Sequence, residues 1–168
     1  VDLQDQQLGI MGKMEAHEKA ELHRAFSVFI LNSNGELLLQ QRAREKYHSP
    51  GLWTNACCSH QREGESNLEA GKRRLMEEMG MTVTLQELFF FIYKASFDNG
   101  LTEHELDHVM LGYSDEDPEI NTDEVAAFKW VPIDVLKKEL YDNPDDYTVW
   151  FAIIFDRFCE YLEDQTKL

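Results

Sequence analysis

The chain has 168 residues, 43% of them hydrophobic, which is enough apolar material for one core of ordinary domain size. Its formal net charge of −16 opposes binding to the phosphate backbone of a nucleic acid or to an anionic membrane surface. No apolar run approaches the roughly 20 residues of a membrane-spanning helix, so neither a nucleic acid nor a membrane is an expected partner.

Strand-forming residues dominate the first third of the chain. Two runs rich in β-forming residues, 24–31 and 36–43, flank a segment that ends in Asn34-Gly35, where glycine supplies the positive φ of a tight turn. This pattern predicts a β-hairpin. Pro50-Gly51 predicts a turn, and the alternation in residues 52–58 predicts a strand after it.

Residues 66–79 form the clearest predicted helix. Ser66 and Glu69 have the spacing of a capping box, in which each side chain bonds the backbone N–H of the other residue. Gly80 stands where a glycine commonly ends a helix.

Further strands are predicted after this helix. Runs 85–95 and 104–113 have the composition of paired strands around Asp98-Asn99-Gly100, and residues 126–131 form a short strand before Pro132.

Two more helices are expected near the C-terminus. Pro132 is suited to open a short helix, and Asp145 or Asp146 to cap a final helix with an apolar stripe that includes Trp150. Short strands mixed with three helical patterns, without a repeat or a linker, indicate that residues 1–168 form a single domain of mixed α/β (α+β) class.

The cysteines suggest a compartment and one pair of neighbours. Cys57, Cys58 and Cys159 are an odd number in a chain without a secretory leader, which predicts a reducing, cytoplasmic setting. Because strand side chains alternate, Cys58 and His60 are expected to share a face, with Cys57 on the other.

Carboxylates and imidazoles recur with alternating spacing. Glu103 and Glu105 are expected on one face of a strand, and His17 and His23 lie just before the first strand. Paired carboxylates with imidazoles are the ligands expected for Mn²⁺, Zn²⁺, Fe²⁺ or Mg²⁺. The same residues are also consistent with a solvated acidic strand and scattered surface histidines.

Cations gather in two short segments of this acidic chain, which favours a local anion site. The segments contain Arg42, Arg44 and Lys46 after the second strand and Lys72, Arg73 and Arg74 on the helix. The alternative is a face of ordinary exposed ion pairs, since Glu77 and Glu78 stand four residues after Arg73 and Arg74.

Residues 59–81 resemble the Nudix box, commonly written Gx5Ex7REUxEExGU. The positions retained are Glu65, Arg73, Leu75, Glu77, Glu78, Gly80 and Met81. Ser59 stands where the motif has Gly, and Arg74 stands where it has Glu. Because the glutamates of a Nudix hydrolase hold the metal ions that activate water, a cation at this position weakens the hydrolase interpretation.

Nearly the whole chain is similar to the type I isopentenyl-diphosphate isomerases, which have the Nudix fold. The resemblance rests on Leu22-His23-Arg24-Ala25-Phe26, Pro50-Gly51-Leu52-Trp53-Thr54-Asn55, Cys58-Ser59-His60, Arg73-Arg74, Glu103-His104-Glu105 and Trp150. It implies a mixed β-sheet sandwiched between helices, and a reaction that moves a double bond instead of hydrolysing a phosphate.

The resemblance also implies an active site. The family's acid/base pair falls on Cys58 and Glu105, its tyrosine on Tyr93 and the tryptophan that faces the alkene on Trp150. Its metal site, for Mn²⁺, Zn²⁺ or Mg²⁺, falls on His17, His23, His60, Glu103 and Glu105. Without the resemblance, Trp150 fits an ordinary core position on the final helix.

The resemblance implies a second ion as well. Mg²⁺ is carried by the substrate diphosphate and held by the backbone carbonyl of Cys58 and by Glu78. The cations implied to meet the diphosphate are Lys13, Arg42, Lys46 and Arg74. The expected partner is a small diphosphate, and the expected state is a monomer or weak dimer.

Two other functions remain open at this point. One is a Nudix pyrophosphohydrolase that acts on a nucleotide or another diphosphate, and the other is a non-catalytic binding module of the same fold. The sequence also leaves open which of Cys58 and Glu105 delivers the proton and which removes it.

Overall fold

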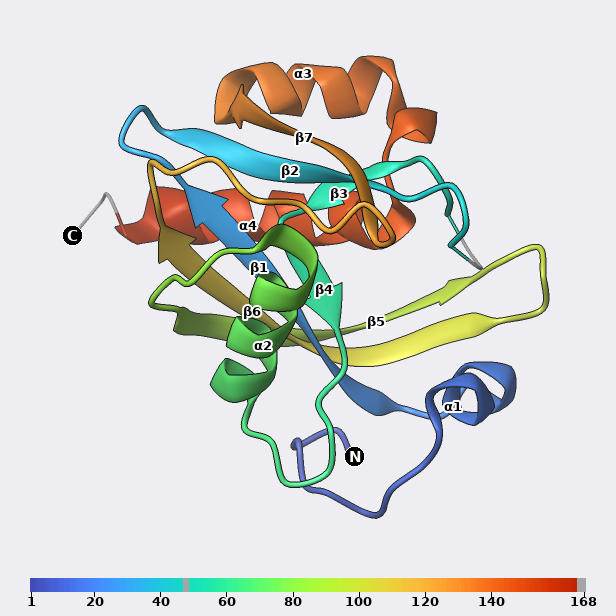
Figure 1. The fold of residues 1–168 in the computed structure, drawn as a ribbon. Helices are drawn as coiled ribbons and strands as arrows, with labels where there is room; N and C mark the ends of the chain where they lie inside the picture. The colour runs from blue at the N-terminus through green and yellow to red at the C-terminus, as the bar shows by residue number, and fades with distance from the viewer. Residues whose placement is uncertain (47–48, 166–168) are drawn as a thin grey trace.

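One mixed β-sheet organises the chain, with the strand order β3-β2-β1-β6-β5 (Figure 1). A computed structural model describes residues 1–46 and 49–165. The strands are β1 (His23–Leu31), β2 (Glu36–Arg42), β3 (Trp53–Asn55), β4 (Cys57–Ser59), β5 (Gln86–Ser96), β6 (Thr102–Tyr113) and β7 (Val125–Pro132). The helices are α1 (Lys13–Lys19), α2 (Asn67–Met79), α3 (Ile133–Asp142), the short 3₁₀ turn Pro144–Asp146 and α4 (Val149–Gln165).

Strand β1 lies at the centre of the sheet. It pairs in parallel with β6 over its full length and antiparallel with β4 on its other side, while β2 pairs with β7 and β3. The predicted hairpin is confirmed, with Gly35 at φ 74° in the turn, but β1 and β2 share one register pair, Leu31 with Leu37, before they diverge. The divergence opens the sheet beside β4.

The sheet has a helix on each face, as Figure 1 shows for α2 and α4. Alternation along β1 sends Phe26, Val28 and Ile30 toward the cluster that includes residues of α2, and Phe29 and Leu31 toward the cluster that includes α4. The expected mixed sheet between helices is therefore confirmed.

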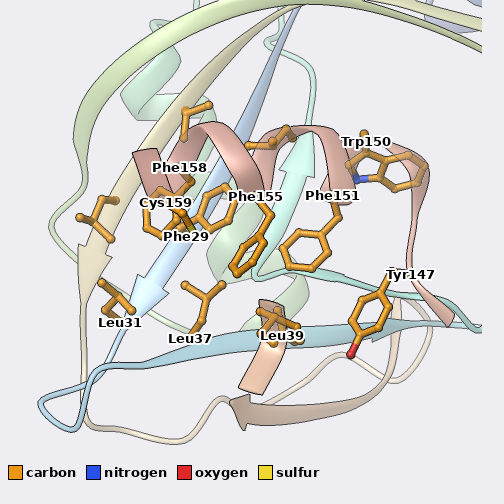
Figure 2. Packing of buried hydrophobic residues seen from close by; sticks show 14 of the residues in the cluster. Phe29, Leu31, Leu37, Leu39, Tyr147, Trp150, Phe151, Phe155, Phe158 and Cys159 are labelled. Atoms are coloured by element: carbon orange, nitrogen blue, oxygen red, sulfur yellow. The ribbon is translucent and has the colours of Figure 1, made fainter. Parts of the chain in front are cut away.

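Aromatic residues of α4 make up much of the second cluster (Figure 2). The rings of Phe29 and Phe158 stack with centroids 4.3 Å apart, and Phe151 and Phe155 continue the row along the helix. Trp150 lies at the end of this row, where the core meets the cleft described below.

Helix α2 has the predicted ends. The Ser66 hydroxyl accepts the Glu69 backbone N–H, and the Glu69 carboxylate accepts the Ser66 backbone N–H, so the capping box is complete. Gly80 ends the helix at φ 64°, and a Cβ there would lie 2.5 Å from the carbonyl oxygen of Glu119. Glycine is therefore required by both conformation and space.

Three predicted boundaries are wrong in detail. The strand expected at 52–58 is two strands interrupted at Ala56. The helix expected after Pro132 is present, but Pro132 is the last residue of β7 and the N-cap of α3 and not its first helical residue. Asp145 and Asp146 lie in the 3₁₀ turn. The helix α4 is capped instead by Thr148, whose hydroxyl accepts the backbone N–H of Phe151 at 3.4 Å.

Helix α1 was not predicted, because its seven residues are too few to show a helical period. It ends at Ala20, which has the left-handed φ of 54°. The helix buries Ala16 and His17, and His17 is thereby held inside the protein.

No helix among the described residues is long and apolar enough to cross a membrane.

Candidate active site

A cleft lies at the N-terminal end of β6, where the strand carries Glu103 and Glu105. Most of the residues proposed from the sequence line it, and they come from α1, β2, β4, α2, β5, β6 and α4 or from the loops next to them. The lining includes Lys13, His17, Arg42, Lys46, Cys58, His60, Arg74, Glu78, Tyr93, Glu103, Glu105 and Trp150. Of the proposed residues, only His23 is not among those that line this cleft.

Strand register explains how distant residues meet at one point. In the parallel pair, His23 of β1 lies opposite Glu105 of β6, and in the antiparallel pair Tyr93 of β5 lies opposite the same glutamate. The Tyr93 hydroxyl donates to Glu105 at 2.7 Å and to Glu103 at 3.0 Å. Both carboxylates therefore lie on one face, as alternation predicts, while His104 points the other way and contacts the Ala20 carbonyl.

Three imidazoles converge on Glu105. Its Oε1 lies 3.0 Å from Nε2 of His60, 3.5 Å from Nε2 of His23 and 3.7 Å from Nε2 of His17. One ligand atom from each of these four residues lies within 4.8 Å of the others. This arrangement is typical of a divalent metal site with nitrogen and oxygen ligands.

The imidazole nitrogens are oriented for a metal. The Nδ1 of His23 lies 2.8 Å from the carbonyl oxygen of Glu21, an acceptor, so Nδ1 carries the proton and Nε2 offers its lone pair to the cluster. The buried Nε2 of His17 has no hydrogen-bond partner among the described residues. A bound cation would satisfy that nitrogen, so the residues present fit a divalent metal.

Glu103 lies beside Glu105, and both carboxylates accept the Tyr93 hydroxyl. Its carboxylate is hydrogen-bonded by Tyr93 but is not one of the four clustered ligands within the described residues. Like His17, His60 and Glu105, it lines the cleft.

The carboxyl groups of β6 differ in charge. Burial alone would raise the pKa of Glu105, but the three imidazoles beside it, of which His60 is hydrogen-bonded to it, lower that pKa well below its ordinary value. Burial, with repulsion from Glu105, raises the pKa of Glu103, and it raises the pKa of Asp107 to about 8. The negative charge of the strand is therefore concentrated on Glu105, the residue nearest the histidines.

Cys58 lies on β4, on the other side of β1 from Glu105. Burial raises the pKa of its thiol to about 12, and the nearby carboxylates add to this effect while Arg42 opposes it. The thiol therefore carries its proton at neutral pH. Cys57 points into the core beneath α2, which confirms the expected separation of the two cysteines.

Trp150 closes the cleft from the α4 side. The guanidinium of Arg42 lies over the Trp150 ring, with Cζ 5.1 Å from the ring centroid. The ring of Phe97 packs edge-on against Trp150, with the ring centroids 6.5 Å apart. Trp150 is 3% exposed, so it is a core residue that also lines the cleft.

Cations also line the cleft. Lys46 pairs with Glu124, and Arg74 donates to Glu77 at 2.7 Å, contacts Glu78 and lies 3.6 Å from Glu124. The ion pairs expected on α2 are therefore present, yet Arg74 lines the cleft as well. Burial lowers the pKa of Lys46.

Sequence reasoning missed two polar residues of this region. Gln40 donates to the Glu78 carboxylate at 2.8 Å and to the Ala56 carbonyl at 2.7 Å, and Ser27 lines the cleft opposite Cys58 in the β1–β4 register. Alternation from Arg42 would have placed Gln40 on the cleft side of β2. The signal for Ser27 was a single hydroxyl within an otherwise apolar strand.

Arg73, the neighbour of Arg74, has a structural role. Its guanidinium donates two hydrogen bonds to the Glu65 carboxylate, from Nε to Oε1 at 2.5 Å and from Nη2 to Oε2 at 2.8 Å. The hydrogen bond from Arg73 lowers the pKa of Glu65 to about 2. Because this pKa lies below the ordinary value of 4.5, the pair stabilises the fold at neutral pH and loses that effect as the pH falls from 4.5 to 2.

We therefore expect Glu65→Gln to lower the free energy of unfolding at pH 7 by about 1–2 kcal/mol. The difference from the wild-type protein should shrink steadily below pH 4.5, since the Glu65 carboxylate of the unfolded protein then takes up a proton while that of the folded protein stays ionised until about pH 2. Urea denaturation at pH 7, 5, 4 and 3 measures this difference. A difference that stays constant down to pH 3 would contradict the assignment.

Comparisons with known proteins show the family of this chain. The NUDIX domain family matches residues 21–151. The isopentenyl-diphosphate Delta-isomerase of Pectobacterium atrosepticum is 50% identical over 161 residues, which cover 96% of this chain and 90% of that protein. The isopentenyl-diphosphate Delta-isomerase 2 of Photorhabdus laumondii is 49% identical over 156 residues, covering 93% and 88% respectively.

Solved structures of low sequence identity share the fold. A protein from Deinococcus radiodurans superposes with a TM-score of 0.69 at 20% identity, covering 80% of this chain and 82% of that one. A MutT protein from Methanosarcina mazei superposes with a TM-score of 0.67 at 21% identity, covering 83% and 94%.

Proposed function

The chain belongs to the NUDIX family and, within it, to the isopentenyl-diphosphate Delta-isomerases, and from this premise we propose a role for each side chain of the cleft. The protein interconverts isopentenyl diphosphate and dimethylallyl diphosphate. The reaction adds a proton to the terminal carbon of an alkene, forms a tertiary carbocation and removes a proton from the neighbouring carbon on the other side.

One observation carries the assignment of the acid/base pair. Cys58 and Glu105 line one cleft from strands on either side of β1, so an alkene between them meets a different group on each side. In the free protein one group holds a proton and the other is ionised, because burial raises the pKa of Cys58 to about 12 while the histidines lower that of Glu105. Such a pair can deliver one proton and accept another.

A divalent metal belongs at the cluster of His17, His23, His60 and Glu105. When bound there, the ion supplies a positive charge that holds the Glu105 carboxylate in one orientation. We propose Mn²⁺ or Zn²⁺ for this site, or Mg²⁺, with Glu103 near enough to join the ligand set. The buried nitrogen of His17 and the fixed tautomer of His23 support a metal here.

The diphosphate binds where cations line the cleft, a part called the diphosphate wall below. Arg42, Lys46 and Arg74 line this part of the cleft, and Lys13 reaches the cleft from α1. Glu78 lies beside Arg74, where it and the Cys58 backbone carbonyl are suited to hold the Mg²⁺ that the diphosphate carries. Charge at this wall anchors the short alkene and contributes binding energy away from the reacting carbons.

Tyr93 and Trp150 complete the site. The Tyr93 hydroxyl donates to Glu105, and burial keeps the tyrosine neutral by raising its pKa well above the ordinary value. The indole of Trp150 presents a π face to the carbocation, worth about 2 kcal/mol when desolvated.

Arg74 separates this function from hydrolysis. It stands at a position where the Nudix box has a metal-binding glutamate, and in the structure it contacts Glu77 and Glu78 instead of adding a third carboxylate to them. The alternative, a pyrophosphohydrolase, would use a carboxylate at this position to help hold its metal ions, and Arg74 cannot do so.

A pair of NMR measurements on one sample tests the function. Isopentenyl diphosphate is incubated with the protein and Mg²⁺, the alkene signals are followed by proton NMR and phosphate release by phosphorus NMR. Conversion to dimethylallyl diphosphate without phosphate release is expected. Phosphate release without isomerisation would replace this proposal with the hydrolase.

Arg74 also provides a test of the diphosphate wall. We expect Arg74→Gln to raise the KM for isopentenyl diphosphate by about tenfold or more, because it removes a charged partner of the phosphate oxygens. The exposed neighbour Lys72 on the same helix is the matched control, and Lys72→Gln should leave KM unchanged. Steady-state kinetics decide, and an equal KM for both variants and the wild-type protein would contradict the assignment.

A further inference from the structure

Three polar side chains lie inside the apolar interior between the Cys58 strand and the Trp150 helix. They are Thr54 of β3, Asn55 at the end of β3 and Thr148 just before α4, and they are 1%, 0% and 0% exposed. Buried polar groups are costly unless each hydrogen-bonding atom has a partner. The partners of these three residues therefore indicate what the residues do.

The side chains form one directed chain of hydrogen bonds. The Thr148 hydroxyl donates to the Thr54 hydroxyl at 3.0 Å, and the Thr54 hydroxyl donates to the Asn55 side-chain carbonyl at 2.9 Å. The Asn55 amide then donates to the carbonyl oxygen of Cys57 at 2.7 Å and to that of Val28 at 3.1 Å. Each of the two hydroxyls donates one hydrogen bond, and the Asn55 amide donates two, so every donor in the chain has an acceptor.

The two ends of this chain are parts of the cleft. At one end, the Cys57 carbonyl belongs to the peptide that leads into Cys58, and Asn55 stands beside the break that separates β3 from β4. At the other end, Thr148 caps the first turn of α4, the turn that carries Trp150. The backbone N–H of Thr148 also donates to the Trp53 carbonyl at 3.0 Å, so the start of α4 is tied directly to β3.

We propose that Thr54, Asn55 and Thr148 are positioning residues that hold the Cys58 strand and the Trp150 helix at a fixed separation across the alkene. This inference rests on the proposed function, since it assigns the chain of hydrogen bonds to the geometry of that reaction. Misplacement of a reacting group by about 1 Å is enough to cost about a hundredfold in rate. A directed, fully paired chain in a dry interior has few alternative arrangements and so limits such displacement.

Matched substitutions separate the hydroxyls from the methyl groups. Thr54→Val and Thr148→Val keep the shape of the side chain and remove the hydroxyl, whereas Thr54→Ser and Thr148→Ser keep the hydroxyl and remove the methyl group. We expect the valine variants to lower kcat by about 10- to 100-fold with KM changed less than about twofold, because the diphosphate wall is not part of the chain. The serine variants should retain most of the wild-type kcat.

Two further measurements separate positioning from a general loss of stability. Val131→Ala removes apolar contacts in the same core cluster without touching the hydrogen bonds, and it should lower the melting temperature while leaving kcat near the wild-type value. Alkylation of Cys58, followed by mass spectrometry, should be faster in the valine variants than in the serine variants and Val131→Ala, because a displaced β4 exposes the thiol.

The outcomes have distinct meanings. Serine variants as slow as the valine variants, or a loss of kcat in Val131→Ala that matches theirs, would overturn the positioning role and leave packing as the explanation. Absence of isomerisation by the wild-type protein would overturn the proposed function instead. In that case the alkylation rates alone would still decide whether the hydroxyls hold β4 in place.

Discussion

Cys58→Ala is expected to abolish isomerisation, with kcat reduced by about 10²–10⁴-fold or more, because the variant has no group to exchange a proton on that side of the alkene. The diphosphate wall remains intact, so binding of isopentenyl diphosphate should change little. Activity is measured by proton NMR at saturating substrate, and binding by isothermal titration calorimetry.

The neighbouring cysteine provides the control. Cys57 is fully buried beneath α2, and its side chain faces away from the cleft. Cys57→Ala makes the same chemical change one residue away, so it should lower stability modestly and leave kcat within about twofold of the wild-type value. Equal losses of kcat in both variants would contradict the assignment of Cys58.

Glu105→Gln is expected to lose both activity and metal. The substitution keeps the size of the side chain and removes the charge that the three histidines surround. We expect the affinity for Mn²⁺ to fall by about 10- to 100-fold or more, because a neutral amide is a poor ligand, and kcat to fall by about 10²–10⁴-fold. Electron paramagnetic resonance with Mn²⁺ measures the free ion directly, independently of turnover.

Glu87 on β5 supplies the matched control for this substitution. Its carboxylate is partly exposed, contacts His108 and Asn67, and belongs neither to the clustered ligands nor to the lining of the cleft. Glu87→Gln should leave both Mn²⁺ affinity and kcat at wild-type values. Unchanged Mn²⁺ affinity in Glu105→Gln would exclude Glu105 as a ligand.

Alternation along strands predicts much of the site. The shared face of Glu103 and Glu105 and the opposite directions of Cys57 and Cys58 follow from a period of two and are confirmed. The capping box of Ser66 and the glycine at position 80 are likewise local features, set by residues within a few positions of each other.

The convergence of His23 on Glu105 is not a local feature. It depends on the parallel register of β1 and β6. Strands β2 to β5 and helix α2 lie between these two strands in the sequence, and no spacing in the sequence specifies their register. The resemblance to a family supplied the ligand set, and the register of the structure explains it.

Thr148 and Asn55 illustrate a second limit. Aspartate is a better N-cap residue than threonine, but Asp145 and Asp146 lie in the 3₁₀ turn, too far before α4 to cap it. Thr148 directly precedes α4, and its hydroxyl accepts the backbone N–H of Phe151. The break at Ala56 has no propensity signal, because it depends on the tertiary bond from the Asn55 side chain to the Val28 carbonyl, alongside the local bond to the Cys57 carbonyl.

The most direct test of the central claim is the origin of the new proton in the product. In D₂O with isopentenyl diphosphate and Mg²⁺, the wild-type protein at low conversion should form dimethylallyl diphosphate that carries one solvent deuteron in a methyl group, seen by deuterium NMR. Cys58→Ala and Glu105→Gln should form none. Product free of deuterium, or turnover at the wild-type rate in either variant, would contradict proton transfer by this pair.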